Sequence, residues 1–185
     1  MPKRKKIAVL FSGQGSNFAH IVHTLHKQDL EIAVALTNNP QAGGIEIARE
    51  NAIPLEIIDS KGYESREAFD SAVVERLRPY DVDLTVLAGF MRILTPVFTE
   101  QVKSINLHPS LLPRHKGLKA IERSYEDEYP EGGVSVHWVT SELDGGEIIL
   151  QKEVAKEGLS FEAYYAEVRA IEKVALEEAI REILH

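Results

Sequence analysis

The stretch "KIAVLFSGQGSN" (residues 6–17) decides the fold, because it joins a strand, a turn and the start of a helix. Its first half is a continuous apolar run rich in branched side chains, which is typical of a strand buried on both faces. Ser12 and Gly13 end the run, and apolar residues then recur at helical spacing (Phe18, Ile21 and Leu25). A buried strand followed by an amphipathic helix is the first half of a βαβ unit.

The same alternation continues along the chain. Further strands are expected at "EIAVALTN", "IPLEIID", "VDLTVLAGF" and "SINLHPS", followed by a strand pair, "VSVHWVT" and "EIILQKEVA", joined by "SELDGG". Helices are expected at "GIEIARENA", at "SREAFDSAVVERLRPY" with Ser65 as N-cap, and from Ser160 to the end. Strands separated by helices predict an α/β fold with an open, mostly parallel, twisted sheet and helices on both faces. We expect residues 1–185 to form a single domain.

Composition narrows the class of protein. The 185 residues contain 44% hydrophobic and 27% charged side chains, as an ordinary globular domain does. Apolar runs are shorter than the roughly 18 residues that a membrane span needs, so no membrane association is expected. The formal net charge of -8 argues against nucleic acid as a partner. Cysteine is absent, which excludes disulfides and thiolate chemistry and fits a cytoplasmic enzyme.

The glycine turn between the first strand and the first helix can hold an anion, because backbone N–H groups point outward at a helix N-terminus. It does not match the dinucleotide fingerprint, since Phe18 occupies the place of the third glycine. Gly15, Ser16 and Asn17 therefore form a candidate seat for a phosphate monoester. A turn and helix cap without a ligand is the alternative.

A second polar cluster is predicted at the end of the fifth strand. In "NLHPS", Asn106 and His108 share one face by period-two alternation, while Leu107 is expected to point into the core. An amide and an imidazole together can stabilise an oxyanion. Asp144, in "LDGG", is a candidate partner for the imidazole, although Asp-Gly-Gly is more often a simple hairpin turn.

The remaining histidines have less specific patterns. His20, His23 and His26 recur along the first helix at a spacing too wide for one metal ion, and we expect them at the surface. His137 alternates with apolar neighbours on a strand, so it either lines the site or packs in the core. A metal site at His108, His137 and Asp144 is conceivable by ligand type, but no spacing indicates it and no metal is expected.

The motifs "SGQGSN", "VLAGFMRIL", "NLHPSLLP" and "SVHWVTSELDGGEIILQ", in this order, resemble the phosphoribosylglycinamide formyltransferases, the folate-dependent formyltransferases of purine biosynthesis. The resemblance covers nearly the whole chain and implies their Rossmann-like formyltransferase fold. It implies 10-formyltetrahydrofolate as co-substrate and phosphoribosylglycinamide as substrate, in a monomer or homodimer.

The resemblance also implies residue roles. Asn106, His108 and Asp144 match the catalytic trio of the family, and Gly15, Ser16 and Asn17 match its phosphate loop. Arg169 and Glu172 match positions near the phosphate and ribose. The folate-binding positions that match are Arg66, Met91, Arg92, Ile93, Leu94, Asn106, Val139 and Leu143.

The implied reaction is attack of the glycinamide amine on the formyl carbon. Asn106 and protonated His108 would donate to the resulting oxyanion, and Asp144 would favour the charged ring. One departure from the family pattern is the segment after "SLLP", where His115 and Lys116 replace the usual Tyr or Phe and Pro. The alternatives are a 10-formyltetrahydrofolate hydrolase and a non-catalytic phosphosugar-binding module, which would need the glycine loop but not the trio.

Overall fold

The computed structural model describes residues 3–185, and its contacts divide the chain into two compact units. The first unit ends at Ile105 and the second begins at Asn106. Strand β5 (Ser104–His108) runs across this division, so that Asn106 and His108 belong to the second unit. The expectation of a single domain covers residues 1 and 2, which lie outside the described residues, and it stays a prediction.

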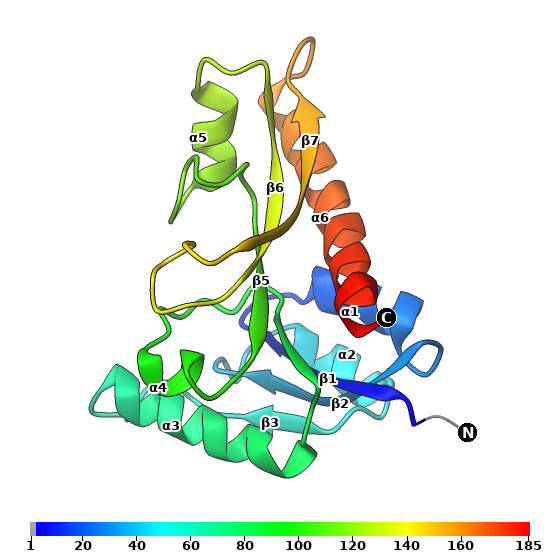
Figure 1. The fold of residues 1–185 in the computed structure, drawn as a ribbon, viewed down its shortest axis with the longest axis vertical. Helices are drawn as coiled ribbons and strands as arrows, with labels where there is room; N and C mark the ends of the chain where they lie inside the picture. The colour runs from blue at the N-terminus through cyan, green and yellow to red at the C-terminus, as the bar shows by residue number, and fades with distance from the viewer. Residues whose placement is uncertain (1–2) are drawn as a thin grey trace. The chain divides into compact units, whose positions relative to one another are not determined.

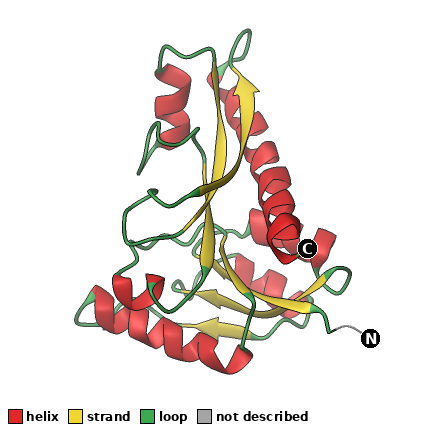
Figure 2. Cartoon of the chain, in the orientation of Figure 1, coloured by secondary structure: helices red, strands yellow, loops and turns green. Residues whose placement is uncertain are grey.

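The first unit alternates strands and helices along its length (Figures 1 and 2). Its strands are β1 (Lys5–Phe11), β2 (Leu30–Thr37), β3 (Leu55–Ile57) and β4 (Leu84–Leu87). Its helices are α1 (Ser16–Leu25), α2 (Gly44–Glu50), α3 (Arg66–Leu77), the 3-10 turn η1 (Arg78–Tyr80) and α4 (Pro96–Thr99). β1 pairs in parallel with β2 and β4, and β2 pairs in parallel with β3. Parallel neighbours need crossover connections, which the helices supply.

The core of the first unit is built on β1. Residues 7–11 of this strand are fully buried, as the continuous apolar run predicts, and Phe11 stacks on Phe18 with ring centroids 5.1 Å apart. Burying each such side chain stabilises the fold by about 1.5–3 kcal/mol. α2 begins at a glycine because a Cβ on Gly44 would lie 2.4 Å from the Phe11 ring.

The second unit contains α5 (Ala120–Glu126), β6 (Glu131–Trp138), β7 (Ile148–Ala155) and α6 (Phe161–Leu184). β6 and β7 form the expected antiparallel pair. α6 lies along both strands (Figure 1), and its apolar stripe includes the buried Tyr164, Val168 and Leu176. The helix begins where the sequence predicts it, and Ser160 is its N-cap, whose Oγ accepts a hydrogen bond from the Ala163 N–H at 3.1 Å.

The seven strands have the order β3-β2-β1-β4-β5-β6-β7, which confirms the α/β class and the mostly parallel sheet. The predicted cap of α3 is also confirmed, since Ser65 Oγ accepts from the Ala68 N–H. β4 is shorter than expected, because Gly89 adopts φ 80° and turns the chain out of the extended conformation. Leu107 was expected in the core, but it is only half-buried. Among residues 3–185, no helix is long and apolar enough to cross a membrane.

Candidate active site

The three side chains of the predicted trio come together in the second unit. Asn106 and His108 are two residues apart on β5, so the pleat turns both to the same side. Asp144 comes from the loop between β6 and β7, where it adopts φ 51°. Its Oδ2 lies 3.5 Å from His108 Nδ1, and both side chains are less than one-tenth exposed. The expected contact between carboxylate and imidazole is present, while the catalytic role of each residue stays a prediction.

His137, whose role the sequence left open, lies between two members of the trio, Asn106 and Asp144. Its Nε2 lies 3.4 Å from Asn106 Nδ2 and 3.7 Å from Asp144 Oδ1. Its Nδ1 lies 3.0 Å from the Trp138 carbonyl oxygen. Because a carbonyl can only accept, Nδ1 carries the hydrogen, and Nε2 of the neutral ring accepts from the Asn106 amide. The contact with His137 therefore determines the orientation of the Asn106 amide, with its nitrogen toward the ring.

The environment of His137 favours the neutral ring. Burial lowers its pKa, and the nearby His108 lowers it further, against the opposing effects of the Trp138 carbonyl and Asp144. A histidine with a pKa below its ordinary value is mostly uncharged at neutral pH. Period-two alternation was the only sequence signal for this role, and it could not reveal the partners.

His108 has an acceptor at each ring nitrogen. Its Nε2 donates to the His115 carbonyl oxygen at 2.8 Å, and its Nδ1 faces Asp144. A neutral imidazole has one N–H and can satisfy only one of these acceptors, whereas the imidazolium satisfies both. The ring of His108 thus lies between two acceptors, whereas burial favours the neutral ring of His137.

The predicted phosphate seat lies in the first unit, at the start of α1. Gly15 is the N-cap with φ 80°, and a Cβ there would lie 2.9 Å from the Gly44 backbone. Ser16 and Asn17 form the first turn of α1, which the structure describes in full and which carries no acidic side chain. The first N–H groups of a helix lack intrahelical acceptors and carry partial positive charge. Such a helix start suits an anion, and the phosphate seat at residues 15–17 stays a prediction.

Residues 91–94, the predicted folate segment, are tied down at both ends within the first unit. The Met91 N–H donates to Ser12 Oγ at 2.8 Å, and Ser12 Oγ donates to Asn38 Oδ1 at 2.6 Å. At the other end, Thr95 N and Oγ1 each donate to Asp70 Oδ2 at 2.7 Å. The anchors leave the apolar side chains of Met91 and Ile93 exposed.

Asp70 is a functional candidate that the sequence reasoning missed. It is fully buried on α3, although carboxylates are rarely buried without a role. Nothing in "SREAFD" distinguishes it from a surface aspartate, because its partner Thr95 is distant in sequence. Arg92 is oriented by a neighbouring residue of α3, since its guanidinium lies 4.2 Å from the centre of the Phe69 ring.

The remaining predicted residues lie in both units. Arg66 is exposed at the first residue of α3 in the first unit. In the second unit, Val139 is half-buried and Leu143 is exposed, both on the chain between β6 and β7. On α6, Arg169 Nη1 lies 2.5 Å from Oε1 of Glu172, and Glu172 is buried.

The histidines of the first helix differ from expectation in one respect. His23 is exposed and His20 half-buried, but His26 is the C-cap of α1, and its Nδ1 accepts from the Ile32 N–H at 3.0 Å. His26 is half-buried, as His20 is, and it also makes a structural contact between α1 and β2 that the sequence did not indicate. Within residues 3–185, no group of three or more His, Asp or Glu side chains is arranged to hold a metal ion.

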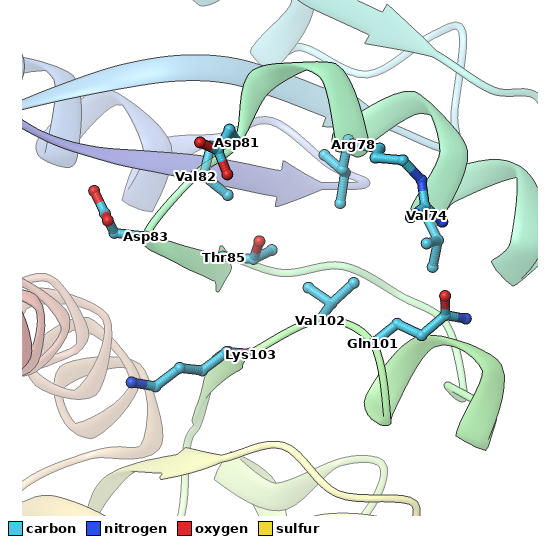
Figure 3. Close-up of a pocket in the computed structure, with 10 residues that line it drawn as sticks. Val74, Arg78, Asp81, Val82, Asp83, Thr85, Gln101, Val102 and Lys103 are labelled. Carbon is cyan, nitrogen blue, oxygen red and sulfur yellow. The ribbon is translucent and has the colours of Figure 1, made fainter.

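A cavity of about 410 Å³ opens in the first unit, near the start of β4. Its wall includes Val74 and Arg78, Asp83 and Thr85 around the start of β4, and Lys103 (Figure 3). Ligand sites in open α/β sheets lie at the carboxyl ends of the strands, whereas this cavity lies at the amino end of β4. Among the described residues that line it, none belongs to the predicted site.

Comparison with known proteins gives consistent matches. The formyl transferase family model matches residues 5–180. The phosphoribosylglycinamide formyltransferase of Haemophilus influenzae is 42% identical over 154 residues, which cover 81% of this chain and 73% of that protein. The protein of the same name from Escherichia coli is 40% identical over 152 residues, which cover 80% of this chain and 72% of that one.

Solved structures agree with these matches. The crystal structure of phosphoribosylglycinamide formyltransferase from Campylobacter jejuni superposes with a TM-score of 0.95 at 48% identity, covering 98% of both chains. Glycinamide ribonucleotide transformylase 1 from Geobacillus kaustophilus gives a TM-score of 0.92 at 33% identity, with 98% of this chain and 100% of that chain covered.

Proposed function

We propose, because the chain belongs to the formyl transferase family, that it transfers the formyl group of 10-formyltetrahydrofolate to the amine of phosphoribosylglycinamide. This reaction is a step of purine biosynthesis, and it implies a cytoplasmic location. The observation that carries the proposal is the pair of oriented donors on β5. His108 is held between two acceptors, and the amide of Asn106 is oriented by His137.

The chemistry needs an oxyanion stabilised at the formyl carbon. The substrate amine attacks this carbon and forms a tetrahedral intermediate whose oxygen becomes negative. The free N–H of Asn106 Nδ2 and an N–H of His108 are the donors we assign to that oxygen. The proton of the attacking amine then moves to the folate nitrogen, and the bond from the formyl carbon to that nitrogen breaks. The products are the formylated amide and tetrahydrofolate.

His108 has to exchange an acceptor when the oxyanion forms, because both of its ring nitrogens already face one. A charged oxygen is a stronger acceptor than a neutral carbonyl, since charge-assisted hydrogen bonds are roughly twice as strong. The exchange of the His115 carbonyl for the oxyanion therefore stabilises the transition state more than the ground state. Differences of this kind accelerate a reaction.

The substrate-binding roles are assigned residue by residue. For the phosphate we propose the first N–H groups of α1, at Gly15, Ser16 and Asn17, because a helix start without acidic side chains attracts a dianion. Arg169 and Glu172 on α6 are assigned to the phosphate and the ribose of the same substrate.

The folate-binding roles are assigned in the same way. Residues 91–94 offer exposed apolar side chains and backbone groups on an anchored segment, which suits the flat ring of a pterin. We also assign folate-binding roles to Arg66 and, in the second unit, to Asn106, Val139 and Leu143. No metal is assigned to the reaction.

The test is a transfer assay with purified protein, 10-formyltetrahydrofolate and phosphoribosylglycinamide, in which the release of tetrahydrofolate is followed. Release that requires the amine supports the proposal. Release of formate without the amine would instead indicate a hydrolase. Binding of phosphoribosylglycinamide without any turnover would indicate a phosphosugar-binding module.

A further inference from the structure

The segment of residues 114–117, where the chain departs from the family pattern, contacts His108 and Asp144 of the trio through its backbone. The His115 carbonyl accepts from His108 Nε2 at 2.8 Å. Two residues later, the Gly117 N–H donates to Asp144 Oδ2 at 2.9 Å. The position of this short segment therefore sets where two of the three predicted catalytic side chains are held.

The His115 side chain anchors the segment to a fixed point. Its Nε2 lies 2.7 Å from Oδ2 of Asp127, the C-cap of α5. Lys156 Nζ donates to the other oxygen of Asp127 at 2.6 Å and to the Ser124 carbonyl at 2.7 Å. The Tyr129 N–H donates to the same oxygen as Lys156. Asp127 is thus held by two donors besides His115, and one of them, Lys156, is itself fixed by the Ser124 carbonyl.

The charge state of Asp127 agrees with this arrangement. Burial disfavours its ionised form, but hydrogen bonds from Lys156, His115 and the Tyr129 N–H outweigh burial and leave the pKa below its ordinary value. His115 itself adopts φ 52°, a left-handed conformation that is unfavourable for a residue with a Cβ. Contacts must maintain such a backbone, and the hydrogen bond of the ring with Asp127 is one of them.

We propose that His115 is a positioning residue of the reaction: its ring, bound to Asp127, holds its own carbonyl on His108 Nε2. This role rests on the proposed function, because it matters only if His108 acts on the substrate. Without the carbonyl, a neutral His108 could place its single hydrogen on Nδ1 and satisfy Asp144 alone. With the carbonyl in place, both acceptors are satisfied only by the charged ring. His115 therefore keeps a hydrogen on the nitrogen that we assign to the oxyanion.

The test compares three variants with the parent protein. His115→Phe keeps a ring but removes the N–H that binds Asp127. We expect kcat to fall about 10- to 100-fold, because a displacement of about 1 Å at a reacting group can cost about 100-fold. KM for both substrates should change little. His115→Gln, which can place an amide N–H near the former Nε2, should recover most of kcat. Lys116→Ala, in the same segment, removes only an ion pair with exposed Glu142 and is the matched control.

A second readout separates this proposal from the proposed function. Nitrogen NMR of the His108 ring reports which nitrogen carries hydrogen, and it requires no turnover. In His115→Phe we expect the neutral ring to shift toward the Nδ1–H form, with the parental pattern in His115→Gln and Lys116→Ala. If His115→Phe does not fold, Asp127→Asn, which perturbs the same contact from the other side, replaces it in both measurements. Parental kcat together with an unchanged His108 spectrum in the folded variant would overturn the proposal. Absence of transfer activity in the parent would overturn the proposed function but not the NMR result.

Discussion

Replacing Asp70 with alanine should loosen the predicted folate segment and destabilise the first unit. Asp70 Oδ2 accepts two hydrogen bonds from Thr95, from its N–H and its hydroxyl, each at 2.7 Å. Both residues are buried, so alanine at this position leaves two donors without an acceptor. Residues 91–94 would then lose their anchor at the Thr95 end and keep the one at Met91, through Ser12.

The size of the effect follows from the two donors. A buried donor left without a partner costs about 1–3 kcal/mol, so two cost about 2–6 kcal/mol. Two effects reduce this sum. Thr95 is 8% exposed, so water can reach it after a small movement, and the mutation also removes a buried carboxylate whose Oδ1 has no hydrogen-bond partner among residues 3–185. We expect the free energy of unfolding to fall by about 2–4 kcal/mol, in the lower half of that range.

Urea unfolding followed by circular dichroism measures this change, with Asp70→Asn as the matched control. Asparagine keeps an oxygen acceptor for Thr95 and should cost about 1 kcal/mol, the net value of a typical hydrogen bond. Affinity for the folate should fall in Asp70→Ala more than affinity for phosphoribosylglycinamide. If the alanine variant loses no more stability than the asparagine variant, Asp70 does not hold the segment and the reasoning is refuted.

Three further predictions concern the site. Ser16→Asp should weaken phosphoribosylglycinamide roughly 10-fold or more and leave folate affinity unchanged, because a carboxylate at a helix start repels a dianion; equal losses in two titrations would contradict the phosphate seat. Asn106→Ala should lower kcat by about 10²–10³ with the fold intact, the usual effect of losing one oxyanion donor; near-parental turnover would exclude that role. Because burial lowers the pKa of His137, its contribution to stability is complete above its unfolded pKa of about 6.5 and is lost as pH falls below it. Urea unfolding of His137→Gln should therefore depend less on pH between neutral and mildly acidic values than that of the parent; an identical dependence would show that His137 is not buried in the neutral form.

The fold was predictable because its signals are local. The apolar run of β1, the glycine turn and the helical spacing of α1 lie next to one another, and Ser65 and Ser160 each cap the helix that directly follows. The catalytic trio could also be predicted in part, because Asn106 and His108 lie two residues apart on one strand. The early end of β4 was not predictable. A strand can end at a glycine or continue through it, and Gly89 alone does not show which of the two happens.

The contacts that orient the site were not predictable, because they join positions far apart in sequence. Asp70 and Thr95 are separated by 25 residues, and Asn106 and His137 by 31. Each pair depends on which strands become neighbours and in which register, and composition or periodicity carries no such information. The segment after "SLLP" illustrates the limit: sequence marked His115 as unusual, but its carbonyl on His108 and its ring on Asp127 depend on a left-handed backbone.

A single carboxylate faces two histidines in this site, and the other contacts of the two rings differ. Asp144 lies 3.5 Å from His108 Nδ1 and 3.7 Å from His137 Nε2, so Coulomb attraction alone hardly distinguishes them. The partner at the Nε2 atom of each ring distinguishes the two histidines. His108 Nε2 meets an acceptor, the His115 carbonyl, whereas His137 Nε2 meets a donor, the Asn106 amide. A proton on His137 Nε2 would oppose that amide, in agreement with the neutral ring that burial favours. The Asn106 amide therefore makes two contacts in the proposed reaction, one with the neutral His137 ring and one with the oxyanion. Its removal should lower turnover through the loss of the second contact.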